Sequence, residues 1–110
     1  MRRGELYRLQ NPPGDTKRQR VFVVVSRQSV VDSRFSTLIC APIFSEGQGM
    51  STQVPVGIDE GLKHESWIQC DGLTSIRKSE LRQYVGSLSH PKLVQLDRAL
   101  AMALDIHFQP

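Results

Sequence analysis

The sequence predicts a mainly β protein with one C-terminal α-helix, in which a strongly curved antiparallel sheet packs against the helix. Short apolar or alternating runs, enough for five to seven strands, are separated by short turn segments. Strands joined by such short connections pair antiparallel. Only residues 89–104 repeat their apolar side chains at helical spacing. At 110 residues, the chain is expected to form one domain, 1–110.

Three strands are predicted in the N-terminal half, over residues 4–9, 20–26 and 37–44. The first alternates weakly and ends at a turn-forming Asn-Pro-Pro-Gly segment. The second is an almost unbroken apolar run, which is typical of a buried strand. In the third, Pro42 indicates an edge, a bulge or the end of the strand. Between the last two, residues 29–35 have room for one helical turn.

Three more strands are predicted in the C-terminal half, over residues 52–56, 66–73 and 84–88. Alternation around Trp67 favours a half-buried strand, whereas residues 76–81 are interpreted as a turn or short connection. Ser89 is a favoured N-cap and Pro91 falls in the first turn, so a helix is expected to begin here. Its predicted apolar stripe consists of Leu93, Leu96, Leu100, Ala103 and Leu104.

The net charge of +3 is unevenly distributed along the chain. Residues 1–34 carry eight Arg and Lys against three acids, a balance of +5, and residues 35–110 carry six against eight, a balance of −2. A concentrated basic region favours an anionic partner, of which nucleic acid is the commonest. A solvated positive face without a partner explains the same distribution equally well.

Cysteine usage and hydropathy favour a cytoplasmic protein. Cys40 and Cys70 lie in apolar runs, form no Cys-x-x-Cys pair and have no His at metal-ligand spacing, so we expect buried, reduced thiols. No apolar run reaches the roughly 20 residues that a membrane span needs. The two N-terminal arginines are not followed by an apolar signal-peptide core, so secretion is not expected.

The segment Lys17–Arg20 places cations at the start of the buried second strand. On a strand, Arg18 and Arg20 point to the same side, where two guanidinium groups can clasp a phosphate. Ser45 follows the third strand and lies within reach of these arginines if the second and third strands are neighbours. A basic strand end without a ligand remains the alternative. The sequence has no nucleotide-binding, zinc-protease or serine-hydrolase motif, and its three histidines are too scattered for a metal site.

Five segments, in order along the chain, carry a family resemblance. They are Arg3–Tyr7, Arg20–Ser26, Thr37–Ser45, Ser66–Ile76 and the predicted helix Pro91–Leu104. Each segment is a weak signal alone, but together they span nearly the whole chain. Taken in this order, they make the sequence resemble the MazF/PemK family of toxin endoribonucleases, which belong to type II toxin–antitoxin systems.

The resemblance implies a compact barrel-like antiparallel sheet of the SH3-like MazF–CcdB fold, usually in a homodimer. It implies metal-independent, sequence-selective cleavage of single-stranded RNA, often messenger RNA, without a cofactor. In that reaction the 2′-hydroxyl attacks the adjacent phosphorus and leaves a 2′,3′-cyclic phosphate and a 5′-hydroxyl end. It also implies a cognate antitoxin that covers the RNA groove with an extended acidic segment.

The resemblance also assigns roles to individual residues. The key arginine of the family corresponds to Arg20, and electrostatic stabilisation of the phosphorane is favoured over proton transfer because arginine is hard to deprotonate. The family's catalytic Thr or Ser corresponds to Phe44, so Ser45 is expected to substitute, which requires a bulge or a chain that is already leaving the strand. Five further residues are expected to bind RNA: Lys17, Arg18, Gln53, Asp71 and Thr74.

The sequence departs from the family pattern in three places. The loop over residues 11–17 does not match, Val21 replaces the usual Pro, and Gly72 stands where a polar residue often contacts RNA. The cleavage sequence therefore stays open. Two alternatives also stay open: a CcdB-like toxin that binds gyrase without nuclease activity, and a non-catalytic RNA-binding domain. CcdB-like chains use a Trp near the C-terminus, whereas the one Trp here is Trp67.

Overall fold

The computed structural model describes residues 1–9 and 20–107 of the chain. Its strands are β1 (Glu5–Arg8), β2 (Val21–Val24), β3 (Thr37–Phe44), β4 (Gln53–Val56), β5 (Ser66–Gln69), β6 (Thr74–Arg77) and β7 (Gln83–Ser87). Its helices are α1 (Gln28–Val31) and α2 (His90–Ala103), with single 3-10 turns η1 (Ile58–Glu60), η2 (Cys70–Gly72) and η3 (Lys78–Glu80).

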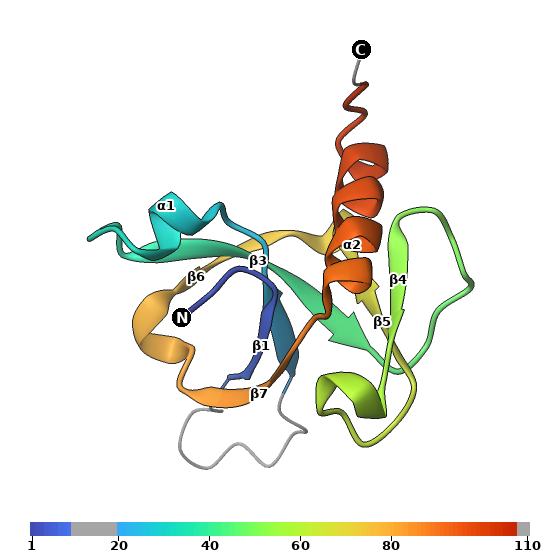
Figure 1. Ribbon diagram of the computed structural model, residues 1–110, viewed down its shortest axis with the longest axis horizontal. Helices are drawn as coiled ribbons and strands as arrows, with labels where there is room; N and C mark the ends of the chain where they lie inside the picture. The colour runs from blue at the N-terminus through green and yellow to red at the C-terminus, as the bar shows by residue number, and fades with distance from the viewer. Residues whose placement is uncertain (10–19, 108–110) are drawn as a thin grey trace.

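The strands form one sheet in the order β4-β5-β3-β2-β1-β7, and β6 pairs with β3 beside this path. Every strand pair is antiparallel. The sheet curls into an open half-barrel, and α2 packs beside β4 and the turn η2 (Figure 1). The predicted class, a curved antiparallel sheet with a C-terminal helix, is therefore confirmed.

The eight-residue strand β3 is the centre of the sheet. One edge pairs with β2, while the other pairs with β6 over Thr37–Cys40 and then with β5 at Ile43 and Phe44. Pro42 lies inside this strand, so its interpretation as an edge or a strand end was wrong. Pro42 lies between the part of β3 that pairs with β6 and the part that pairs with β5. Neither of these two strands therefore needs an amide donor from it.

Strand β6 was missed by the sequence analysis, which assigned residues 76–81 to a turn. Ile76 pairs with Leu38 on β3 and is buried, whereas the other residues of β6 are exposed. With one inward apolar side chain, β6 has too short an alternating pattern to indicate a strand. The turn η3 then follows at residues 78–80, so the predicted connection is correct in its second half.

Apolar side chains pack against both faces of the sheet. One cluster lies between the sheet and α2 and includes Leu6, Val23, Ile43, Ile68 and Leu96. The other lies on the opposite face beside α1 and includes Tyr7, Phe22, Val24, Leu38 and Cys40. Strand β2 contributes to both, and all four of its residues are buried. This two-sided burial explains why its sequence is continuously apolar instead of alternating.

Helix α2 begins where the sequence predicts. The Ser89 hydroxyl accepts a hydrogen bond from the Lys92 amide at 3.4 Å, and Pro91 lies in the first turn. The helix approaches β1 so closely that a side chain at Gly4 would clash with Leu93. Leu96 is fully buried, but Leu104, predicted to belong to the apolar stripe, is 56% exposed because the end of α2 projects beyond the sheet (Figure 1).

Among the described residues, no helix is long and apolar enough to cross a membrane.

Arg3 joins α2 to the end of β2, because its guanidinium donates to Asp97 at 2.8 Å and to the Val25 carbonyl at 3.0 Å. This link and the Leu96 side chain fix the helix on the sheet. Ala99, Leu100 and Ala103 continue this packing along the later turns, so α2 is held along one side, and its end beyond Ala103 is exposed.

Replacing Leu96 with Ala should lower the free energy of unfolding by about 2–5 kcal/mol, because it leaves a cavity in a fully buried site. The same replacement at exposed Leu104 is the matched control and should change stability by less than about 0.5 kcal/mol. Urea unfolding followed by circular dichroism measures both. Equal losses for the two variants would show that α2 is not held as described.

Both cysteines are free and buried, as predicted. Burial raises the pKa of Cys40 to about 12, and burial with the Asp71 carboxylate raises the pKa of Cys70 to about 11. Since the thiolate is the reactive form, neither thiol should be labelled by a disulfide-exchange reagent in the folded protein at a pH of about 8. Both should react rapidly in urea. Fast labelling of either thiol in the native protein would contradict this burial.

Candidate active site

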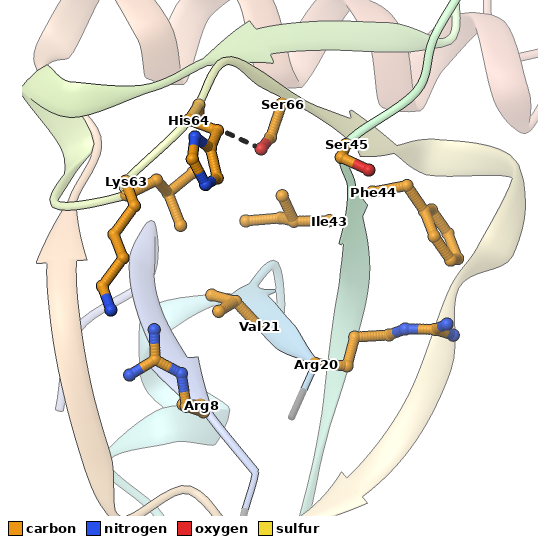
Figure 2. A pocket seen from close by; sticks show the side chains of 10 residues that line it. Arg8, Arg20, Val21, Ile43, Phe44, Ser45, Lys63, His64 and Ser66 are labelled. Carbon is orange, nitrogen blue, oxygen red and sulfur yellow. Dashed lines mark hydrogen bonds between the residues drawn. The ribbon is translucent and has the colours of Figure 1, made fainter. Parts of the chain in front are cut away.

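A hollow of about 460 Å³ opens at the ends of β1, β2 and β3 and at the chain segment that leads into β5. Its floor is apolar and consists of Val21, Ile43 and Leu62. Its rim is mostly basic and polar, with one aromatic residue. The rim residues are Arg8, Arg20, Phe44, Ser45, Lys63, His64 and Ser66 (Figure 2). None of the described residues that line it is acidic, so the hollow attracts anions.

Arg20 is held at this rim by its backbone and by its side chain. Its carbonyl accepts a hydrogen bond from the Leu9 amide at 3.1 Å, which ties it to the end of β1. Phe22 pairs with Pro42, and the continuation of this register brings Arg20 opposite Phe44. The Arg20 guanidinium lies over the Phe44 ring, 4.3 Å from its centroid, within the range of a cation–π interaction.

Ser45 is the first residue after β3 and lines the same hollow as Arg20. Figure 2 shows Ser45 above Ile43, with Phe44 and the Arg20 guanidinium on the same side of the hollow as its hydroxyl. The structure thus brings the two predicted catalytic residues to one cavity. It also places the aromatic ring of Phe44 directly against the Arg20 guanidinium.

The segment after Ser45 is held down by two glutamines and the indole of Trp67. Gln53 Oε1 accepts hydrogen bonds from the amides of Gln48 and Met50 at 3.0 and 3.2 Å, and Gln53 Nε2 donates to Gln69 Oε1 at 3.0 Å. Gly47 lies against Trp67, where an added Cβ would overlap the indole ring. Gln53, predicted to bind RNA, is therefore engaged in fixing this loop.

Two further predicted RNA-binding residues, Asp71 and Thr74, lie outside the hollow. Asp71 accepts a hydrogen bond from the Thr52 hydroxyl at 2.7 Å, and Thr74 is exposed on β6 opposite Cys40. Neither lines the cavity that contains Arg20. Lys17 and Arg18 fall outside the described residues. The structure therefore brings together Arg20 and Ser45, but not Asp71 and Thr74, at this hollow.

Four lining residues were missed as site candidates: Arg8, Lys63, His64 and Ser66. Arg8 was counted only in the charge balance, although it is the last residue of β1 and pairs with Val21. Lys63 and His64 precede β5, and the Ser66 hydroxyl donates to the His64 carbonyl at 3.1 Å. A basic residue at a strand end was the available signal for Arg8. Within residues 1–9 and 20–107, no group of three His, Cys, Asp or Glu could hold a metal ion.

A curved antiparallel sheet with a basic hollow at its rim suits a protein that binds an anionic chain. Residues 2–104 match the family described as PemK-like, MazF-like toxin of type II toxin–antitoxin system. The chain therefore belongs to this toxin family, and the resemblance predicted from its five segments is confirmed. It is also 29% identical over 84 residues to Endoribonuclease MazF3 of Mycobacterium tuberculosis, which covers 76% of this chain and 82% of that protein.

Solved structures of similar proteins share the fold. Toxin MazF-mt6 of Mycobacterium tuberculosis superposes with a TM-score of 0.81 at 24% identity, over 94% of this chain and 99% of that one. A mycobacterial endoribonuclease in complex with its cognate antitoxin gives a TM-score of 0.82 at 20% identity, over 99% of each chain. The curved sheet with its C-terminal helix is thus the shared architecture of these toxins.

Replacing Gly47 with Ala should displace the loop from Trp67, because the added methyl group has no space beside the indole. We expect a loss of about 1–3 kcal/mol in the free energy of unfolding and a shift in the fluorescence of Trp67, the one Trp of the chain. Gln48→Ala is the control, since it keeps the backbone amide that binds Gln53. Unchanged emission and stability in Gly47→Ala would contradict the packing.

Proposed function

We propose that this toxin is an endoribonuclease that cuts single-stranded RNA, messenger RNA in particular, with sequence selectivity and without a metal. Membership of the MazF-like toxin family and the name of its mycobacterial relative support this activity. The observation that carries the proposal is the position of Arg20, fixed over Phe44 at the rim of a basic hollow that also contains the Ser45 hydroxyl. We further propose that the reaction takes place in the cytoplasm.

In the proposed reaction the RNA supplies its own nucleophile. The 2′-oxygen forms a bond to the adjacent phosphorus as the 2′-hydroxyl loses its proton, and the bond from phosphorus to the 5′-oxygen breaks as that oxygen gains a proton. The products are a 2′,3′-cyclic phosphate and a 5′-hydroxyl end. Negative charge accumulates on the phosphoryl oxygens in the transition state, so a cation already held in place there lowers the barrier.

Arg20 is assigned this electrostatic role. The central carbon of its guanidinium lies 4.3 Å from the centroid of the Phe44 ring, so the ring supports one side of the cation and the N–H groups turned away from the ring can donate to phosphoryl oxygens. Ser45, on the same rim, is assigned a hydrogen bond to a phosphoryl oxygen or to the leaving 5′-oxygen. Arginine stays protonated at neutral pH, which suits charge stabilisation better than proton abstraction.

We also propose that a cognate antitoxin inhibits the toxin and that the toxin forms a homodimer. The hollow has a basic rim and an apolar floor, so an extended acidic segment with an apolar side chain would compete with RNA for it. A mycobacterial endoribonuclease and a toxin of Deinococcus radiodurans that share the fold were solved with their antitoxins. The gyrase-binding alternative lacks such support, because Trp67 lies under the 46–50 loop and not near the C-terminus.

Arg20→Ala should reduce the cleavage rate of a single-stranded messenger RNA by about 10²–10³-fold, because one preorganised donor to the transition state is lost. Ser45→Ala should reduce it less, and Arg20→Lys should retain part of it by keeping the charge. The rates are measured on end-labelled RNA in the presence of EDTA.

Binding to the same RNA with 2′-deoxyribose at the cut site serves as the control for folding and affinity. Arg20→Ala should keep most of this binding. An RNA left intact by the wild-type protein, or cleavage at the wild-type rate by Arg20→Ala, would reject the proposed activity.

A further inference from the structure

The wall of the hollow opposite Arg20 carries a second pair of cations. Arg8 comes from the end of β1 and Lys63 from the segment that leads into β5. In Figure 2 the Arg8 guanidinium and the Lys63 ammonium point toward one another, and Val21 separates Arg8 from Arg20. In the same view the Arg20 guanidinium points away from this pair, toward Phe44, so the two groups of cations lie on opposite sides of Val21 along the lining of the hollow.

The backbone positions of both cations are fixed. Arg8 is half-buried between two neighbouring strands, since it pairs with Val21 on β2 and with Gln83 on β7. Lys63 follows a turn in which the Leu62 amide donates to the Gly57 carbonyl at 3.1 Å. Leu62 itself packs against the core cluster beneath α2. Cations on such a fixed frame are a preorganised site, because binding orders only the ends of their side chains.

The charges of this pair are not neutralised within the described part of the protein. Neither Arg8 nor Lys63 has a described carboxylate within 4.0 Å, although Arg3 and His107 do form ion pairs. Lys63 also borders the neighbouring depression, which Asp59, Glu60 and Glu65 line, but none of these acids lines this hollow. Two cations that face each other repel, and an anion between them relieves the repulsion while accepting hydrogen bonds from both.

We propose that Arg8 and Lys63 bind a second phosphate of the RNA strand, next to the phosphate that reacts at Arg20. The two groups of cations line one cavity, and its floor of Val21, Ile43 and Leu62 supports the sugar or base between the two phosphates. This inference rests on the proposed function. It adds a pair of residues that position the RNA strand without taking part in bond breaking.

The test measures how the affinity for a non-cleavable RNA, with 2′-deoxyribose at the cut site, depends on salt. Each phosphate contact contributes about 0.7 to the slope of log K against log salt for a single strand. This slope is negative, so the double variant Arg8→Gln, Lys63→Gln should reduce its magnitude by about 0.7 and weaken binding. Arg98→Gln on the exposed side of α2 removes a cation outside the hollow and should leave the slope unchanged.

Lys63→Gln alone is included because Lys63 is exposed and its replacement does not disturb the sheet. It should raise KM for the cleavable RNA and leave kcat within about twofold of the wild type. A salt slope of the double variant equal to that of Arg98→Gln would overturn the second phosphate site. The expected loss of cleavage in Arg20→Ala does not depend on Arg8 or Lys63. Rejection of the second phosphate site would therefore leave the proposed endoribonuclease activity intact.

Discussion

The burial of β2 on both of its faces is the constraint on which the rest of the structure depends. A strand with apolar residues at every position has no side that can face water, so the sheet must be covered twice. Helix α2 covers one face and the cluster beside α1 covers the other. This requirement holds β2 between β1 and β3. Arg20, the residue just before β2, therefore has a fixed backbone position at the end of the strand.

A fixed strand end has direct consequences for chemistry. An arginine on a free loop loses conformational entropy when it orders around a phosphate, whereas the Arg20 backbone is already bonded to Leu9 and its guanidinium already rests on Phe44. The same argument applies to the opposite wall, where Arg8 is placed by β1 and β7. The fold thus contributes to the proposed reaction mainly by presenting cations before the anion arrives.

The sequence was sufficient for the parts of the fold that have a periodic signal. Continuous apolar residues revealed β2, and Ser89 with Pro91 revealed the start of α2. It failed where tertiary pairing replaces such a signal: β6 has one inward side chain, Ile76, and Pro42 is tolerated inside β3 only because its neighbouring strand changes there. Lys63 could not be linked to Arg8 from the sequence, because 55 positions separate them and only the folded chain brings both to the same hollow.

The alternation of side chains along β3, and the residue at which β3 ends, determine which side chains lie beside Arg20. Successive side chains on a strand point to opposite faces, so with Phe44 against Arg20 the next residue would point away if the strand continued. The strand ends at Phe44, however, and Ser45 already belongs to the segment that Gln53 and Trp67 hold in place. Ser45 lies outside the strand, so its side chain does not have to follow the alternation of β3. It lines the same hollow as Arg20. In the proposed site, an aromatic ring supports the cation, and a hydroxyl from the following loop residue takes the place that the family resemblance gives to a hydroxyl on the strand.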